Sequence, residues 1–275
     1  RSLTGQKPEA EEKLPPVKEY GLSIGVVMTS KDGTYSQFAN LEPTYKMMAN
    51  SVDDYAKSLP EGQQKTNMAE INEAFQFTQD NAKIKGNKAD GAASIAGRIQ
   101  EGKMTSIPFN MEGHAMGMTF IPDNKGGGYL SITNRGLESD ALPGGPGTSI
   151  YEVKDMNALN EDFVKNAMNG HYNGRDMDAI KADLGKVVNL DKPVAHIEQA
   201  AQKRDNCTIA NTRGNIEGIM LCQKAIQEGK KVEDMDTKAA RQDYKAYTEH
   251  MKLEQAKKLA NAMNDPKADP ELRTI

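Results

Sequence analysis

The feature that most constrains the fold is a change of hydrophobic period between residues 104 and 153. Apolar residues in this stretch recur at every second position, which is the period of β-strands, whereas the sequence on both sides repeats with helical spacing. We therefore predict an α+β protein in which helices flank a central mixed or antiparallel sheet. The alternating segments are residues 104–111, 115–121, 128–133 and 149–153.

The two middle segments predict a β-hairpin. Between them lies Asp123-Asn-Lys-Gly-Gly-Gly128, and Asp, Asn and Gly are the residues that tight turns between strands require. In an antiparallel hairpin the start of the first strand lies beside the end of the second. His114 begins the first strand and Asn134 ends the second, so we expect these two residues to be cross-strand neighbours.

The other elements are mainly helical. A first buried strand is expected at residues 21–28 and a last strand at residues 187–197, while the Pro- and Gly-rich residues 142–147 predict a surface loop. Helices are expected at residues 45–55, 68–75, 91–99, 159–168, 177–184, 208–227 and 237–264.

The chain divides into four parts along its length. Because it begins with Arg, we expect it to be part of a longer protein. The last part carries a thin apolar stripe, so it is expected to pack on the edge of the domain or to engage a partner. The parts are a linker or leader at residues 1–20, a mostly helical part at 21–103, a core at 104–230 and a C-terminal helix at 231–275.

Composition excludes several classes of function. A net charge of −4 and a pI near 5.7 argue against nucleic-acid binding, which normally requires a basic face. No apolar run approaches the ~20 residues of a membrane-spanning helix, the glycine runs lack the context of a nucleotide-binding loop, and the cysteines do not provide a zinc site. We therefore expect no cofactor, no metal and no membrane span.

The two cysteines predict free thiols in a reducing compartment. Cys207 and Cys222 fall on one predicted helix, where they would lie ~22 Å apart, too far for a disulfide bond. Cys222 is expected to be a buried apolar residue. His171, His196 and His250 are expected to be surface or structural residues.

Cys207 has the position of a nucleophile. It opens the predicted helix that follows Gln202-Lys-Arg-Asp-Asn206, and a helix N-terminus favours the thiolate over the thiol. A thiolate needs a histidine partner for acyl chemistry, which His114 would provide. A side-chain carbonyl at Asn134 would accept the imidazole N–H and fix the tautomer of the ring.

The order of these residues resembles the clan of SUMO-specific (ubiquitin-like protein) cysteine proteases and adenoviral protease. In that clan a His is followed about twenty residues later by Asp, Glu or Asn, and a Gln shortly precedes a Cys that opens a central helix. The resemblance covers roughly residues 104–225. It implies a papain-like or ubiquitin-like-protease core in which Cys207 is the nucleophile, His114 the base, Asn134 the orienting residue and Gln202 the oxyanion-hole side chain.

The resemblance also implies a function. A bacterial effector of this type would be secreted into the host cytoplasm, where it would act as a cysteine isopeptidase that removes ubiquitin or a ubiquitin-like protein from host protein conjugates. One branch of the clan consists of effector acetyltransferases, and in this alternative Cys207 would carry an acetyl group taken from acetyl-coenzyme A.

A third hypothesis comes from a different class of protein. The chain would be a non-catalytic module whose helical region at residues 35–103 and final helix bind a host protein. Each candidate site residue also has an ordinary structural role open to it. Cys207 would then be a small buried residue, His114 a strand-end residue, Asn134 a turn residue and Gln202 a polar residue in a polar run.

Overall fold

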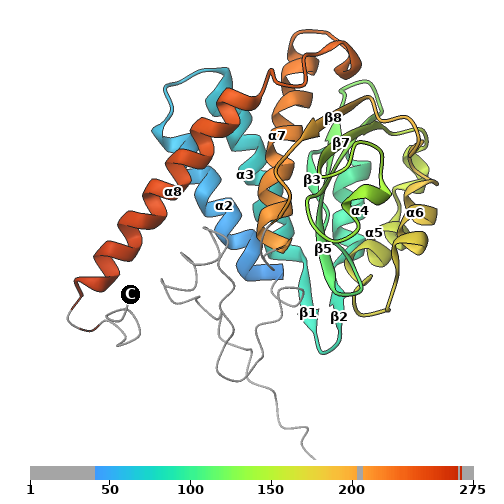
Figure 1. Cartoon of the computed structure of the whole chain (residues 1–275), viewed down its shortest axis with the longest axis horizontal. Coiled ribbons are helices and arrows are strands. Elements are labelled where there is room, and N and C mark those ends of the chain that lie inside the picture. Colours follow the sequence, from blue (N-terminus) through green and yellow to red (C-terminus); the bar gives the residue numbers. More distant parts are fainter. Residues whose placement is uncertain (1–40, 203–206, 266, 268–275) are drawn as a thin grey trace, which may run out of the picture.

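The computed structural model describes residues 41–202, 207–265 and 267 (Figure 1), except for the side chains of residues 41, 42, 207 and 208. The predictions for residues 1–20 and 21–28 lie outside the described residues. The α+β class is confirmed. The helices are α2 (Leu41–Ser58), α3 (Gln63–Asn81), α4 (Ala92–Gln100), α5 (Glu161–Met168), α6 (Met177–Leu184), α7 (Cys207–Gln227) and α8 (Arg241–Met263), with short 3-10 helices η1 (Ser139–Ala141), η2 (Met156–Ala158) and η3 (Val232–Asp234).

The main sheet is antiparallel throughout, with the strand order β3-β5-β6-β7-β8 and with β4 also paired to β5. The predicted hairpin is confirmed: β5 and β6 pair down to Pro122 and Gly128, and Asp123 Oδ1 accepts the Lys125 N–H at 2.7 Å within the turn. The strands are β1 (Lys83–Lys85), β2 (Lys88–Asp90), β3 (Thr105–Ser106), β4 (Phe109–Met111), β5 (His114–Pro122), β6 (Gly128–Asn134), β7 (Gly147–Glu152) and β8 (Ala195–Glu198).

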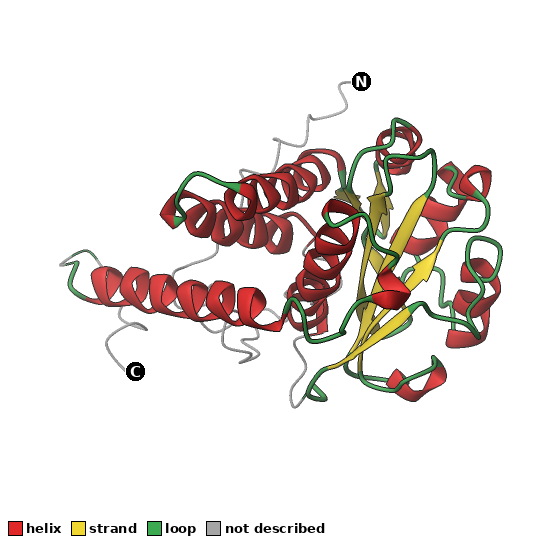
Figure 2. Cartoon of the chain, turned by 90° about the horizontal axis from the view of Figure 1, so that it is seen from above, coloured by secondary structure: helices red, strands yellow, loops and turns green. Residues whose placement is uncertain are grey.

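Helix α7 is the central helix of the fold. It packs along β5, β6 and β7 on one face of the sheet, while α2, α3 and α8 contact its other side. Figure 2 shows these helices on one side of the sheet and the shorter helices on the other. The described core is one continuous cluster that runs from the α2–α3 pair through α7 and the sheet to α5 and α6.

The sheet face beneath α7 is lined by small residues, which lets the helix backbone come unusually close. A Cβ atom added at Gly117 on β5 would lie 2.5 Å from the carbonyl oxygen of Asn211, and one at Gly218 on α7 would lie 2.2 Å from Ser131 Oγ. Both distances are far below van der Waals contact. Glycine at these two positions therefore fixes the separation between helix and sheet.

Buried hydrogen bonds also hold α7 to the sheet. Asn215 Oδ1 accepts from Thr119 Oγ1 at 2.6 Å. Its Nδ2 donates to the Ser131 carbonyl at 2.9 Å and to Thr133 Oγ1 at 2.9 Å. A single amide thus satisfies polar groups of two strands, so polar residues can occupy this covered face without leaving buried groups unpaired.

Replacing Asn215 with Ala is expected to lower the free energy of unfolding by roughly 2–4 kcal/mol, because it leaves several buried polar groups without their partner. The measurement is urea denaturation of the variant beside wild type. Gln227→Ala, which removes an exposed amide near the end of α7, is the control and should change stability by less than about 0.5 kcal/mol. Equal, small effects of both changes would contradict the proposed role of the network.

Three segments differ from the sequence-based expectation. The one strand expected at residues 104–111 forms as two short strands, β3 and β4, on either side of Ile107 and Pro108. The hairpin of β1 and β2 was not predicted, because it consists of only three residues on each side of a turn that contains Gly86 at φ +64°. The expected strand at residues 187–197 is shorter and forms only as β8, while Val188 makes an isolated bridge to Val153. Pro193 lies between them and cannot donate a ladder hydrogen bond.

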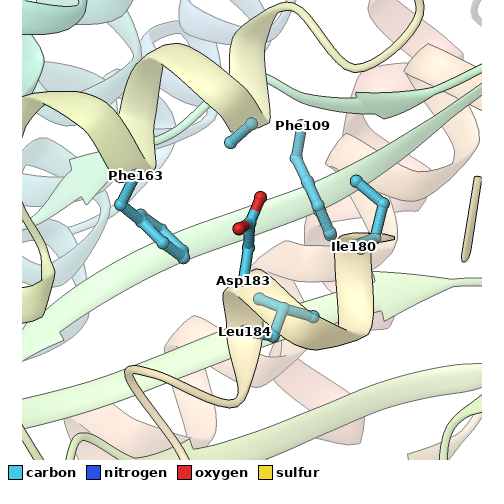
Figure 3. Close-up of a pocket in the computed structure, with 6 residues that line it drawn as sticks. Phe109, Phe163, Ile180, Asp183 and Leu184 are labelled. Atoms are coloured by element: carbon cyan, nitrogen blue, oxygen red, sulfur yellow. The ribbon is translucent and has the colours of Figure 1, made fainter. Parts of the chain in front are cut away.

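A small apolar pocket lies on the sheet face opposite α7, between β4, α5 and α6. Figure 3 shows Asp183 pointing into it among Phe109, Phe163, Ile180 and Leu184. The Asp183 carboxylate is paired with the Arg175 guanidinium. The carboxylate that lines this pocket is therefore already part of an ion pair.

Candidate functional site

The predicted meeting of His114 and Asn134 is confirmed. His114 Nε2 lies 2.8 Å from Asn134 Oδ1, and the two residues are only 3% and 4% exposed. The two residues do not lie directly opposite each other on the strands, which differs from the expected cross-strand pairing. The described β5–β6 ladder ends at the pair Gly117 and Thr133, before it reaches His114. His114 pairs instead with Met111 on β4. The side chains therefore meet diagonally across the strand ends.

The hydrogen bonds of Asn134 assign the tautomer of His114. Asn134 Nδ2 donates to the Leu137 carbonyl at 3.0 Å, and Oδ1 accepts the Gly136 N–H at 3.1 Å. The amide is thereby oriented with its oxygen toward the imidazole, so His114 Nε2 must be the donor. Nδ1 of the neutral ring then carries the lone pair, as a general base requires.

Burial keeps the imidazole neutral. It lowers the pKa of His114 below the ordinary value of 6.5, an effect that the hydrogen bond to Asn134 and the negative charge of Glu138 partly oppose. A neutral imidazole at pH 7 can accept a proton, whereas an imidazolium cannot.

The same shift predicts that stability falls in mild acid. Because the pKa of His114 is lower in the folded than in the unfolded protein, the unfolded chain takes up this proton first as the pH drops below 6.5. The stabilisation is present above that pH and is lost as the pH falls through the folded pKa. Urea midpoints at pH 7.5 and 5.5 should therefore differ less in His114→Gln than in wild type; an identical pH dependence would contradict this.

The first turns of α7 are tied directly to both strands. Asn211 Nδ2 donates to the Ala115 carbonyl at 2.7 Å, and Asn211 Oδ1 accepts the Arg135 N–H at 2.9 Å. Ala115 and Arg135 follow His114 and Asn134 in the sequence. One α7 residue thus joins the two strand ends that carry the histidine and the asparagine.

Cys207 is the first residue of α7, as predicted, but its side chain lies outside the described residues. Its backbone position is four residues, or about one helical turn, before Asn211. The helix therefore starts near the ends of the strands that carry His114 and Asn134. The nucleophilic role of Cys207 stays a prediction.

Gln202 lies at the same end of the sheet. Its N–H donates to the Arg135 carbonyl at 2.6 Å. A Cβ atom at Gly136 would lie 2.8 Å from Gln202 Oε1 and 3.0 Å from His114 Cε1, so the amide and the imidazole flank this glycine. Gln202 is therefore close to His114, and its oxyanion role stays a prediction.

Two further residues organise this site and were not singled out from the sequence. Asn211 could have been recognised as a polar residue one turn after the candidate nucleophile. Arg135 lies in a stretch with no motif; its guanidinium donates to the carbonyls of Ala200 at 2.9 Å and Ala210 at 3.4 Å.

The second cysteine and two further histidines have contacts that are typical of structural residues. Cys222 is fully buried and burial raises the pKa of its thiol, which confirms the expectation of an apolar core residue. His171 Nδ1 accepts the Gly113 N–H, and His196 Nδ1 lies 2.7 Å from Ser149 Oγ.

In the part of the chain that the structure describes, no cluster of three His, Cys, Asp or Glu side chains is suited to a metal ion. A search of the described helices for an apolar stretch that could span a bilayer finds none.

The protein thus has an α+β fold with a buried His–Asn pair at the end of the sheet where its central helix begins. A family model described as "Dot/Icm T4SS effector AnkD/LegA15" matches residues 2–275. The chain belongs to this family of Dot/Icm type IV secretion effectors. The predicted localisation, that of a secreted bacterial effector acting in the host cytoplasm, is thereby confirmed.

The fold is similar to that in the solved structure of the Legionella effector AnkH. The TM-score is 0.59 at 17% sequence identity, and the match covers 94% of this chain and 54% of the AnkH chain. This chain therefore spans about half of that protein, and the likeness concerns the fold alone. A comparison with curated proteins finds no match.

The resemblance to the SUMO-specific protease clan is wrong as an assignment of family. The matching family is that of the AnkD/LegA15 effectors, and the structural neighbour is an effector rather than a ubiquitin-like-protein protease. The pattern that suggested the clan consists of four residues at suitable spacings. A diagonal His–Asn pair and a helix that begins with Cys arise from local geometry, so they do not specify descent.

Proposed function

We propose that this effector acts on a host protein through a thiol site formed by Cys207, His114 and Asn134. The central helix on an antiparallel sheet would then correspond to a papain-like core. The observation that supports this most is the hydrogen bond of 2.8 Å between His114 Nε2 and Asn134 Oδ1. It leaves Nδ1 as the proton-accepting nitrogen at the end of the sheet where α7 begins.

The residues would act in the order that acyl transfer requires. Cys207 Sγ attacks the carbonyl carbon of the acyl donor, which is the host protein or acetyl-coenzyme A, while its proton moves to His114 Nδ1. The Cys207 N–H and the Gln202 amide stabilise the oxyanion of the tetrahedral intermediate. The leaving group then takes the proton from His114, and a thioester on Cys207 remains. Asn134 keeps the imidazole in the required tautomer throughout.

The group that accepts the acyl group from Cys207 determines which of two activities this site would have. Water as the acceptor gives a cysteine hydrolase, whereas a host hydroxyl or amine gives an acyltransferase, including the acetyltransferase that would draw on acetyl-coenzyme A. Both activities pass through a thioester on Cys207, so this intermediate tests the proposal without knowledge of the acceptor.

The experiment is mass spectrometry of the effector after incubation with host-cell lysate and an acid quench. Wild type is expected to carry a hydroxylamine-sensitive acyl group on Cys207, and acetyl-coenzyme A added to a desalted lysate identifies an acetyl donor. The modification should be absent from Cys207→Ala and strongly reduced in His114→Ala. Cys222, which is buried, serves as the internal control. An unmodified Cys207 in wild type would contradict the proposal.

The second candidate is a non-catalytic module that binds a host protein. It is supported by the deep burial of His114 and Asn134 and by two exposed apolar residues on α8, Leu253 at 56% and Met263 at 39% exposure. Figure 1 shows that α8 extends away from the sheet. If this hypothesis holds, Leu253→Glu abolishes the effect on host cells and Cys207→Ala does not. The thiol proposal predicts instead that Cys207→Ala abolishes the effect on host cells and that Leu253→Glu does not.

A further inference from the structure

The Arg135 side chain binds two segments that both lead to the thiol site. Its Nε donates to the Ala200 carbonyl at 2.9 Å, and its Nη1 donates to the Ala210 carbonyl at 3.4 Å. Ala200 lies two residues before Gln202, and Ala210 lies in the first turn of α7, three residues after Cys207. The guanidinium therefore joins the segment that carries Gln202 to the helix that begins with Cys207.

The rest of Arg135 contacts the same two segments. Its carbonyl accepts the Gln202 N–H at 2.6 Å, and its N–H donates to Asn211 Oδ1 at 2.9 Å. The aliphatic stem lies against α7, where a Cβ atom added at Gly214 would be 3.3 Å from Arg135 Cδ. The guanidinium is a rigid, planar set of donors, so two carbonyls bound to it are held at a fixed separation.

The placement of α7 beside His114 has a different anchor. Asn211 Nδ2 donates to the Ala115 carbonyl at 2.7 Å, on the strand that begins with His114. This bond does not involve the Arg135 side chain. Loss of the guanidinium is therefore expected to loosen Gln202 relative to the start of α7, while α7 keeps its place beside His114.

We propose that Arg135 is a positioning residue of the thiol site, whose guanidinium sets the distance between Gln202 and the start of α7. The inference rests on the proposed function, in which the Gln202 amide and the Cys207 N–H stabilise the oxyanion together. Two donors must meet at one oxygen atom, so an error in their separation weakens this stabilisation even though both donors are present. Arg135 itself binds no substrate and transfers no proton.

The test compares two reactions of Cys207 that differ in their need for an oxyanion hole. In acetylation by p-nitrophenyl acetate, Cys207 Sγ forms a bond to the acetyl carbon, its proton passes to His114, and nitrophenolate leaves after an oxyanion has developed. In alkylation by iodoacetamide, Sγ displaces iodide and no oxyanion forms. Peptide mass spectrometry follows both rates at Cys207, and Tm is measured for each variant.

Arg135→Met keeps an aliphatic side chain against α7 and removes the donors. Acetylation should slow about tenfold or more, whereas the alkylation midpoint should stay within about 0.3 pH units of wild type. A direct effect of the Arg135 charge on the thiolate would move that midpoint. Arg135→Lys restores a donor and should recover part of the acetylation rate.

A double-mutant cycle shows whether Arg135 acts through Gln202. Gln202→Ala should slow acetylation at least as much as Arg135→Met does, and the double variant should be no slower than Gln202→Ala alone. Arg241→Met is the matched control, because the Arg241 guanidinium also binds a carbonyl, that of Glu198 at 3.3 Å. This change should alter neither rate more than about twofold.

Three results would overturn the role of Arg135 alone. They are wild-type acetylation in Arg135→Met, losses that multiply in the double variant, and equal slowing of acetylation and alkylation in Arg135→Met, which would indicate a general disturbance of the fold. A wild-type alkylation midpoint near ~8.5 would instead overturn the thiol site, and this inference with it.

Discussion

Alkylation of Cys207 at pH 6.5 is expected to slow on the order of 10-fold when His114 is replaced with Ala. In the proposed site the histidine accepts the thiol proton and an imidazolium forms beside the sulfur, so removal of His114 would return the thiol pKa toward its ordinary value. The measurement is the rate of iodoacetamide incorporation at Cys207, followed by peptide mass spectrometry.

His250→Ala is the matched control for this prediction. His250 packs against Tyr55, with 5.4 Å between ring centroids, in the contact between α8 and α2. Its removal should change the alkylation rate less than twofold if the effect is specific to the site. Equal rates in wild type and His114→Ala would show that the two residues do not interact.

Replacement of Gly117 with Ala is expected to cost about 3 kcal/mol of stability or more. The added Cβ would lie 2.5 Å from the Asn211 carbonyl oxygen and 2.9 Å from its carbon, and backbone atoms of a packed helix cannot move aside as a flexible side chain can. Helix α7 must therefore shift away from β5. Urea denaturation gives the loss of stability.

The same substitution should also slow Cys207 alkylation at pH 6.5, because a shift of α7 moves its first turn away from His114. Gly97→Ala in α4 is the control, since a Cβ there meets nothing within 4 Å, and it should raise stability by roughly 0.5–1 kcal/mol. If Gly117→Ala were as stable as wild type, the close packing of α7 on β5 would not be the constraint that we infer.

The strands and the helices were predictable where their periodicity was strong. The hairpin of β5 and β6 follows from alternating residues around Asp123–Gly128, and α6 forms over the expected residues. Short elements carry too little periodicity to be recognised, which explains why the β1–β2 hairpin was missed. The strand expected at 187–197 was overextended because β-branched residues near Val188 continue the pattern across Pro193.

The covered polar face of the sheet was not predictable from the alternation. Thr119, Ser131 and Thr133 alternate with apolar residues and have the pattern of a solvent-exposed face, yet all three are buried under α7. The reason lies on a distant segment, where Asn215 supplies the hydrogen bonds and Gly218 allows the close approach. A pattern within one strand contains no information about such a partner.

The candidate site shows the same division between local and distant information. The meeting of His114 and Asn134 was predictable because one short hairpin links them. The anchoring of α7 by Asn211 depends on contacts between residues 96 positions apart. Glu138 has a left-handed backbone, with φ +54°, in the loop that closes over Asn134, and no local sequence signal indicates it.

The most direct test of the thiol site is the pH–rate profile for alkylation of Cys207 in the wild-type protein. Cys207 and Cys222 are distinguished by peptide mass spectrometry, and Cys222 should stay unmodified in the folded protein because it is buried. We predict a midpoint for Cys207 at or below about pH 7.5, as for a thiol at a helix N-terminus paired with a histidine. A midpoint at or above ~8.5, the value of an unperturbed cysteine, would contradict it.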